Sequence, residues 1–296
     1  MEIFLSQLFI GLSVASILLL VALGLTFTFG QMNVINMAHG EFVMAGAYTT
    51  YVIQGALGAS LVTLGFLVAL PLAFLVGGAL GVVLEWVLIR RLSGRPLDTL
   101  LATFGVALIL QQVARDVFGA SNVQVRAPAF LDGAITVAGV SMSYTRLFII
   151  ALVGVCLAAI WAHLGRSPAG RRMRAVMQNR DLAAASGVRT PRVDRRTFFI
   201  GSGLAGVAGV AVTLLGSVGP TLGTNYLIDA FLVVIVGGLG RLRGAVMAAV
   251  ALGLFNAYVE YGTDASIAKA AAFALIVVFL QFRPQGLVVQ RARGLT

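Results

Sequence analysis

The stretch Asn33-Val34-Ile35-Asn36-Met37-Ala38-His39-Gly40-Glu41 places two amides, an imidazole and a carboxylate inside an otherwise apolar region. A charged side chain at the centre of a lipid bilayer costs about 3 kcal/mol or more unless it lines water or meets a polar partner. Polar groups that persist at that depth commonly mark the path of a solute or an ion. The stretch therefore predicts a membrane protein that moves something polar.

Composition supports the membrane class. The 296 residues are 59% hydrophobic and 11% charged, and they contain repeated apolar segments of about 20 residues, the length that spans the hydrocarbon core as a helix. The net charge of +10 does not indicate a nucleic-acid partner, because the basic residues lie in short segments between apolar ones. Cys156 is the only cysteine, and His39 and His163 are the only histidines. Neither a disulfide framework, a metal site nor a cofactor is predicted.

Hydrophobic patterning predicts an all-α polytopic membrane protein with eight or nine transmembrane helices, forming one domain over residues 1–296. The expected helices lie near residues 6–29, 34–54, 60–89, 97–118, 144–164, 197–218, 227–240, 244–262 and 266–282. The segments near 34–54 and 227–240 are candidates for broken or re-entrant helices. Four-residue spacing of Gly201, Ala205 and Gly209, and of Gly77 and Gly81, predicts close helix packing.

Arginine positions set the expected orientation, because short cytoplasmic loops are enriched in Lys and Arg. Arginines follow the third, fifth, seventh and ninth apolar segments, within residues 90–95, 166–196, 241–243 and 283–293. These loops and the C-terminus are expected to be cytoplasmic, whereas the N-terminus and the segment 119–143 are expected outside. The N-terminus lacks the basic region and the small-residue cleavage site of a secretory signal, so the first apolar run is expected to be a retained helix.

Polar residues within the apolar segments are the candidates for a translocation pathway. The main ones are Asn33, Asn36, His39, Glu41, Gln111, Asn225 and Asn256, and further candidates are Thr26, Thr28, Gln112, Asp229 and Glu260. If 34–54 is helical, at about 100° per residue, the first three share one arc and Glu41 falls outside it. Either the helix breaks near Gly40 or Glu41 is bound to a neighbouring helix. The alternative is that His39 and Glu41 belong to a buried structural network.

The segment 165–196 contains nine arginines and two aspartates, a net charge of +7. It could serve only as a topology signal. Its internal pattern indicates more, since residues 171–186 read as a short helix that Gly187 would end. The helix has apolar residues that need a contact, and a soluble partner is the expected one. They are Met173, Val176, Met177, Leu182 and Ala185.

Three motifs are specific enough to indicate a family. They are N-x-I-N-M-A-H-G-E-F within residues 24–48, D-L-A-A-A-S-G at 181–187, and L-V-V-I-V-G-G-L-G-R-L-R-G at 232–244. With them the chain resembles, over nearly its whole length, the permease subunits of ABC importers of the branched-chain amino acid and urea group. The second motif is similar to the E-A-A-x-x-x-G coupling motif of ABC permeases, although Asp181 and Leu182 depart from its Glu and Ala.

The resemblance implies a multi-pass subunit of the bacterial inner membrane that is not itself an enzyme. ATP-binding subunits would dock on 165–196, a periplasmic solute-binding protein would deliver the cargo, and a second permease subunit, identical or different, would complete the conduit within the membrane lipid. The coupling residues are expected to be Gly170, Arg171, Arg174, Asp181, Ala185 and Gly187. No G-x-x-x-x-G-K-[ST] motif occurs, which agrees with ATP hydrolysis in separate subunits.

Segments 118–131, 219–226 and 281–287 look more like the urea-type permease than the branched-chain type, so urea is the expected cargo and a branched-chain amino acid is the alternative. Amide side chains can both donate to and accept from urea. The competing class is a stand-alone channel or a proton-coupled carrier, with His39 and Glu41 as its proton relay. An intramembrane enzyme is disfavoured because no catalytic constellation is visible.

Overall fold

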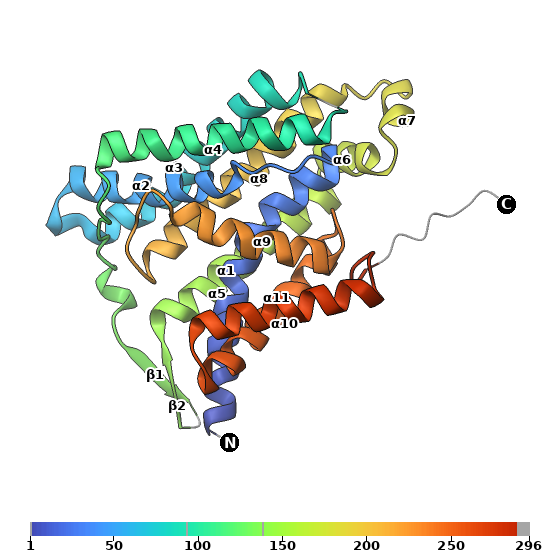
Figure 1. The fold of residues 1–296 in the computed structure, drawn as a ribbon. Helices are drawn as coiled ribbons and strands as arrows, with labels where there is room; N and C mark the ends of the chain where they lie inside the picture. Colours follow the sequence, from blue (N-terminus) through green and yellow to red (C-terminus); the bar gives the residue numbers. More distant parts are fainter. Residues whose placement is uncertain (1, 93, 138, 289–296) are drawn as a thin grey trace.

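The computed structural model describes residues 2–92, 94–137 and 139–288, and it is built almost entirely of helices (Figure 1). The helices are α1 (Glu2–Met32), α2 (His39–Leu57), α3 (Val62–Leu84), α4 (Pro96–Phe118), α5 (Tyr144–Arg166), α6 (Pro168–Gln178), α7 (Arg180–Ala185), α8 (Thr190–Thr213), α9 (Leu222–Gly237), α10 (Leu242–Gly262) and α11 (Ala265–Phe282). A π-helical turn, η2 (Glu85–Ile89), extends α3, and short 3-10 turns lie at η1 (Ala59–Leu61) and η3 (Ala129–Leu131).

Seven helices in the described part of the chain are long and apolar enough to cross a membrane: α1, α3 with its flanking turns, α4, α5, α8, α10 and α11. The polar first turn of α2 and the 16-residue length of α9 set these two apart. Together the nine helices match the nine predicted segments, and the all-α polytopic class is confirmed. Residues Arg291 and Arg293 of the predicted basic C-terminal segment lie outside the described residues.

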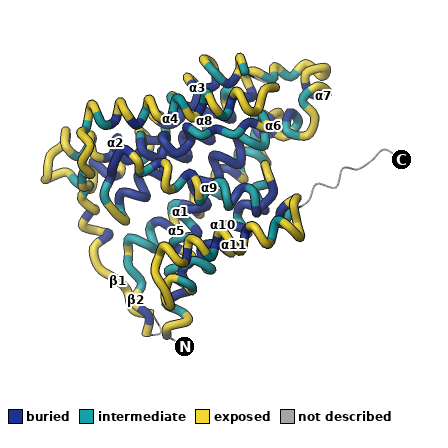
Figure 2. Tube along the Cα trace, viewed as in Figure 1, coloured by how far each residue is buried: buried dark blue, intermediate teal, exposed yellow. Residues whose placement is uncertain are grey.

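Helix α8 lies at the centre of the fold (Figure 2). In its most apolar 18-residue stretch, 83% of the α8 residues are buried, more than in any other of the seven apolar helices. In α5 and α11 only 17% are buried, and these helices leave apolar faces exposed. Glycine explains the packing, because small residues let helix backbones approach closely. A Cβ at Gly201 would lie 2.8 Å from the carbonyl oxygen of Gly24 in α1, and one at Gly209 would collide with the carbonyl of Val43 in α2. The predicted glycine packing of this helix is confirmed.

The molecule has two distinct ends (Figure 1). One, here called the hairpin end, holds the start of α1 and an antiparallel pair of strands, β1 (Ala134–Val137) and β2 (Val140–Ser143). The other, here called the basic end, holds α6 and α7. Helix α1 runs from the first to the second, and α8 starts near α7 and runs back.

Two predicted helices differ from the structure. The segment expected near 34–54 is helical only from His39, because Asn33 has φ +53° and ends α1, and residues 33–36 belong to neither a helix nor a strand. The helix expected over 171–186 is two helices, since Asn179 takes an extended conformation (φ −156°, ψ 107°) and its side chain caps α7 by accepting a hydrogen bond from the Leu182 N–H at 2.9 Å. Ser167 caps α6 in the same way, by accepting from the Gly170 N–H at 2.8 Å.

Candidate functional site

The polar stretch that opens the chain's second helix is a tight connection rather than one face of a helix. Asn36 Oδ1 accepts a hydrogen bond from the Ala38 N–H at 3.0 Å, which forms a local turn directly before α2 begins at His39. His39 is fully buried, and its Nε2 donates to the carbonyl oxygen of Val21 in α1 at 3.1 Å. The shared arc expected for Asn33, Asn36 and His39 is therefore absent. Asn36 and His39 fix how α2 leaves α1.

Glu41 is bound to neighbouring helices, as one of the two sequence interpretations required. Its Oε1 accepts from Gln111 Nε2 of α4 at 2.9 Å and from Thr224 Oγ1 of α9 at 3.3 Å, and Gln111 also donates to Thr224 at 2.9 Å. The close approach of Gly40 and Gly223 brings α2 and α9 together here. This cluster, in which Glu41 and Gln111 are buried and Thr224 is exposed, connects three helices that are distant in sequence.

The remaining candidates lie elsewhere. Asn33 is exposed at the basic end, where it lines a hollow of about 360 Å³ with Arg174 of α6. Asn225 and Asn256 line a separate cavity of about 620 Å³ between α1, α8, α9, α10 and α11. The seven predicted pathway residues thus occupy three places: the turn and cluster around α2, the basic end, and this cavity.

The cavity that contains Asn225 and Asn256 is also lined by charged residues of three membrane helices, and we call it the polar cavity. Its other polar residues are Ser217, Tyr226, Asp229, Glu260 and Lys269. One wall is apolar and comes from the first half of α1, with Val14, Ile17 and Leu18. Residues after the end of α8 and at the start of α11 also line it, which places the polar cavity in the half of the molecule nearer the hairpin end.

An ion pair joins two walls of the polar cavity. Lys269 Nζ of α11 lies 3.4 Å from Asp229 Oδ2 of α9, with side-chain exposures of 55% and 18%. The sequence prediction included Asp229 among the further polar candidates but did not include Lys269. Lys269 is the only lysine of the chain and lies in an apolar helix, and that isolation is the signal that could have identified it.

The predicted coupling residues divide into buried and exposed groups. Gly170 is buried where α6 packs on the end of α5, since a Cβ there would collide with the backbone of His163 and Leu164. The exposed residues are Arg171, Arg174, Asp181, Ala185 and Gly187. Gly187 has φ +82°, a conformation that favours glycine after α7. Among the apolar residues expected to face a partner, Met173 and Val176 instead pack into the core of this chain, and Leu182 is 65% exposed.

Charged contacts join α7 to the membrane helices. The guanidinium of Arg180 in α7 donates two hydrogen bonds to Asp194 of α8, at 3.0 and 2.6 Å, and Gln31 at the end of α1 donates to the same carboxylate at 3.3 Å. The Asp194 side chain is 2% exposed. The hydrogen bonds that it accepts from Arg180 raise the pKa of the Arg180 guanidinium above its ordinary value. Arg195 lies 3.6 Å from the buried Glu85 of η2. The start of α8 is thereby connected to α7, α1 and α3.

Within the described residues, no group of three or more His, Cys, Asp or Glu side chains is placed to hold a metal ion. The two arrangements that remain for function are the polar cavity and the charged contacts at the basic end. The first can accommodate a small solute with both charged and apolar parts. The second connects α7 to α1 and α8, two helices that also line the first.

Comparisons with known proteins cover nearly the whole chain. Residues 7–280 match the model of a family described as "Branched-chain amino acid transport system / permease component". The chain is 29% identical to the high-affinity branched-chain amino acid transport system permease protein BraD of Pseudomonas aeruginosa, over 96% of this chain and 95% of BraD. It is also 29% identical to LivH of Escherichia coli K12, a permease protein of the same description, with 96% and 95% covered. A probable branched-chain amino acid transport permease protein of Methanocaldococcus jannaschii is 25% identical, over 92% of this chain and 89% of that protein. No solved structure matches.

Proposed function

This chain belongs to the family of branched-chain amino acid transport permease components, and we propose that it forms the translocation pathway of an ABC importer for an amino acid with an apolar side chain. The urea expectation has no support from the relatives, whose names favour the branched-chain alternative. Residues 1–296 act as one transmembrane domain of a bacterial inner membrane. The hairpin end and the N-terminus face outside, where a solute-binding protein delivers the cargo, and the basic end and the C-terminus face the cytoplasm.

The observation that carries this proposal is the ion pair of Lys269 and Asp229 at the polar cavity. A zwitterionic amino acid brings a carboxylate and an ammonium, which complement a lysine of α11 and an aspartate of α9. Urea is neutral, so it would gain little from two charges that are costly to keep within a membrane. Asn225 and Asn256 supply both donors and acceptors beside the pair.

The apolar wall of the polar cavity provides the other half of the recognition. Val14, Ile17 and Leu18 of α1 lie along the side of the cavity, where an aliphatic side chain would leave water. A small polar solute has no group for this wall. The combination of a charged pair and an aliphatic surface fits an amino acid with a branched hydrocarbon side chain better than it fits an amide.

The remaining candidates take supporting roles in this proposal. Asn36 and His39 fix the turn between α1 and α2, and the cluster of Glu41, Gln111 and Thr224 holds α2 and α4 against α9. Because Thr224 directly precedes Asn225, a shift of α9 would change the cluster and the cavity together. The ATP-binding subunits dock on the exposed surface of α7 and Gly187, and a second permease subunit covers one of the exposed apolar faces.

Lys269→Gln is expected to lower uptake of labelled leucine by about tenfold to a hundredfold, the usual loss for a hydrogen bond to a charged group. The measurement is uptake into vesicles that contain the complete transporter, with labelled urea as a second substrate. Asp264→Asn is the matched control, because Asp264 is exposed beside the start of α11 and does not line the cavity. Uptake by the control should stay within about twofold of the unchanged protein.

A charge exchange distinguishes cargo recognition from a structural ion pair. The double variant Lys269→Asp with Asp229→Lys keeps an ion pair between α11 and α9 but reverses its direction. If the pair only holds two helices together, the exchange should restore uptake. If the pair binds the carboxylate and the ammonium of the cargo, uptake should stay low while the amount of assembled transporter recovers. Restored leucine uptake in the double variant would contradict the proposed role.

A further inference from the structure

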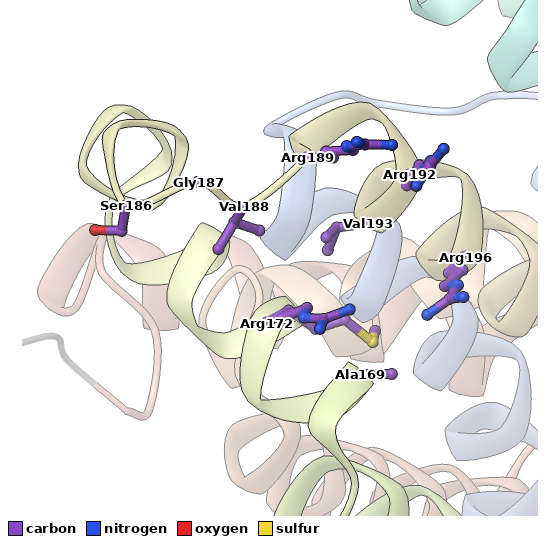
Figure 3. A pocket seen from close by; sticks show the side chains of 10 residues that line it. Ala169, Arg172, Ser186, Gly187, Val188, Arg189, Arg192, Val193 and Arg196 are labelled. Carbon is purple, nitrogen blue, oxygen red and sulfur yellow. The ribbon is translucent and has the colours of Figure 1, made fainter.

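An arginine-lined hollow lies at the basic end, where α6 and the start of α8 meet (Figure 3). It has a volume of about 440 Å³, and four arginines line it: Arg172, Arg189, Arg192 and Arg196. Figure 3 shows Arg172 and Arg196 reaching into the space from opposite sides. The buried side chains of Met173 and Val193 also line it. The hollow therefore has a positive rim and an apolar base.

The charges of this hollow are not neutralised by the chain itself. No aspartate or glutamate lines it, and in the described part of the molecule none of the four arginines forms an ion pair. Two other arginines of the same segment do form ion pairs, Arg180 with Asp194 and Arg195 with Glu85. Four guanidinium groups left around one space form a site for an anion, and guanidinium matches phosphate oxygens in geometry as well as charge.

An apolar groove continues from the arginine-lined hollow towards the middle of the membrane helices. It has a volume of about 340 Å³, and its walls come from α1, α3, α5, α6 and α8, with Phe27, Phe74, Ile160, Ile200, Leu204 and Val207 among the lining residues. Met173 lines both spaces, so they are adjacent. A polar ligand would gain nothing from the groove, whereas a hydrocarbon chain would fill it.

One face of α8 carries both parts of this site. Arg189, Arg192 and Arg196 line the hollow, and Ile200, Leu204 and Val207 continue at three- and four-residue spacing to line the groove. Residues at this spacing lie on one side of a helix. The change from arginine to aliphatic residues follows the direction in which α8 enters the membrane, as does the change from headgroup to acyl chain in a lipid.

We infer that the arginine-lined hollow and the apolar groove together bind one anionic phospholipid, with its phosphate among the four arginines and an acyl chain along α8. An acidic protein segment would match the arginines alone, so the continuity with the groove favours a lipid. Gly187 also lines the hollow, so a lipid held here would bridge α6 and α8 next to the surface proposed for the ATP-binding subunits. The site lies outside the polar cavity, and the inference does not depend on which solute is carried.

The test is a lipid titration of the purified full-length chain in detergent, with bound lipids counted by native mass spectrometry. We expect one dioleoyl phosphatidylglycerol to bind in preference to dioleoyl phosphatidylcholine. The double variant Arg192→Gln with Arg196→Gln should raise the dissociation constant for phosphatidylglycerol by about tenfold or more. Arg91→Gln with Arg283→Gln removes the same charge from exposed arginines that line neither space, and it should leave that constant unchanged.

A second pair of variants tests the acyl-chain groove. Ala159→Trp fills the groove from α5 and should lower phosphatidylglycerol binding as strongly as the arginine variant, whereas Ala151→Trp, on the same helix but away from the groove, should not. Thermal unfolding without added lipid checks that each variant is folded. The inference is overturned if phosphatidylglycerol and phosphatidylcholine bind equally, if Ala159→Trp has no effect, or if inorganic phosphate alone competes as well as the lipid.

Discussion

Gly206→Leu is expected to abolish assembly of the folded protein in the membrane. Gly206 of α8 lies where three helices meet: a Cβ there would collide with the carbonyl oxygen of Ala73 in α3, and a Cβ at Gly46 of α2 would collide with the carbonyl of Gly206 itself. The obstructing atoms are backbone, so no side chain can rotate away. Overpacking of this kind costs about 3 kcal/mol or more, a large part of the roughly 5–15 kcal/mol by which a protein is stable.

The measurement for Gly206→Leu is the yield of monodisperse protein after extraction in mild detergent, followed by its thermal unfolding. We expect the yield to fall by about tenfold or more. Gly154→Leu is the control, since a Cβ at Gly154 of α5 meets nothing within 4 Å and the position is exposed. Leucine is a better helix former than glycine by about 0.8 kcal/mol, so the control should be as stable as the unchanged chain. Normal yield of Gly206→Leu would show that the α2, α3 and α8 contact is dispensable.

The packing at Gly206 shows which parts of the fold can be predicted from sequence. Apolar length locates the membrane helices, because the hydrocarbon thickness fixes how many residues a span needs. Glycine spacing indicates that α8 packs closely, but it does not name the partners: the four-residue rule identified Gly201 and Gly209, while Gly206, which contacts two helices, falls outside that series. Which helices meet depends on contacts between residues far apart in the chain.

Local backbone chemistry limits the prediction at two other places. Asn33 with its positive φ and Asn36 with its side-chain hydrogen bond form a turn where hydrophobicity alone predicted a helix. Asn179 divides the basic segment in the same manner. At the polar cavity, Asn225 and Asn256 were recognised as polar residues in apolar helices. Asp229 was recognised in the same way, but its pairing with Lys269 was not, because that pairing depends on a 3.4 Å distance between residues 40 positions apart in the sequence.

The last prediction concerns how α7 acts on the membrane helices. Asp194→Asn is expected to lower leucine uptake by about tenfold or more while the complex still hydrolyses ATP, because the paired hydrogen bonds from Arg180 are the charged connection between α7 and α8. The same carboxylate also accepts from Gln31 of α1. In the proposed importer, movement of α7 by the ATP-binding subunits would pass through this contact to α1 and α8, two of the helices that line the polar cavity. Without it, α7 moves and α8 stays in place.

Uptake and ATP hydrolysis must be measured on the same vesicles, since only their ratio reports coupling. Asp98→Asn is the matched control: Asp98 also pairs with an arginine, Arg95 at 3.6 Å, but both are largely exposed, and such surface pairs contribute about 0–1 kcal/mol. Asp194→Glu should recover part of the uptake because it keeps the charge. If Asp194→Asn lowered uptake and ATP hydrolysis in proportion, its role would be assembly of the complex rather than transmission, and the basic end would serve only as a docking surface.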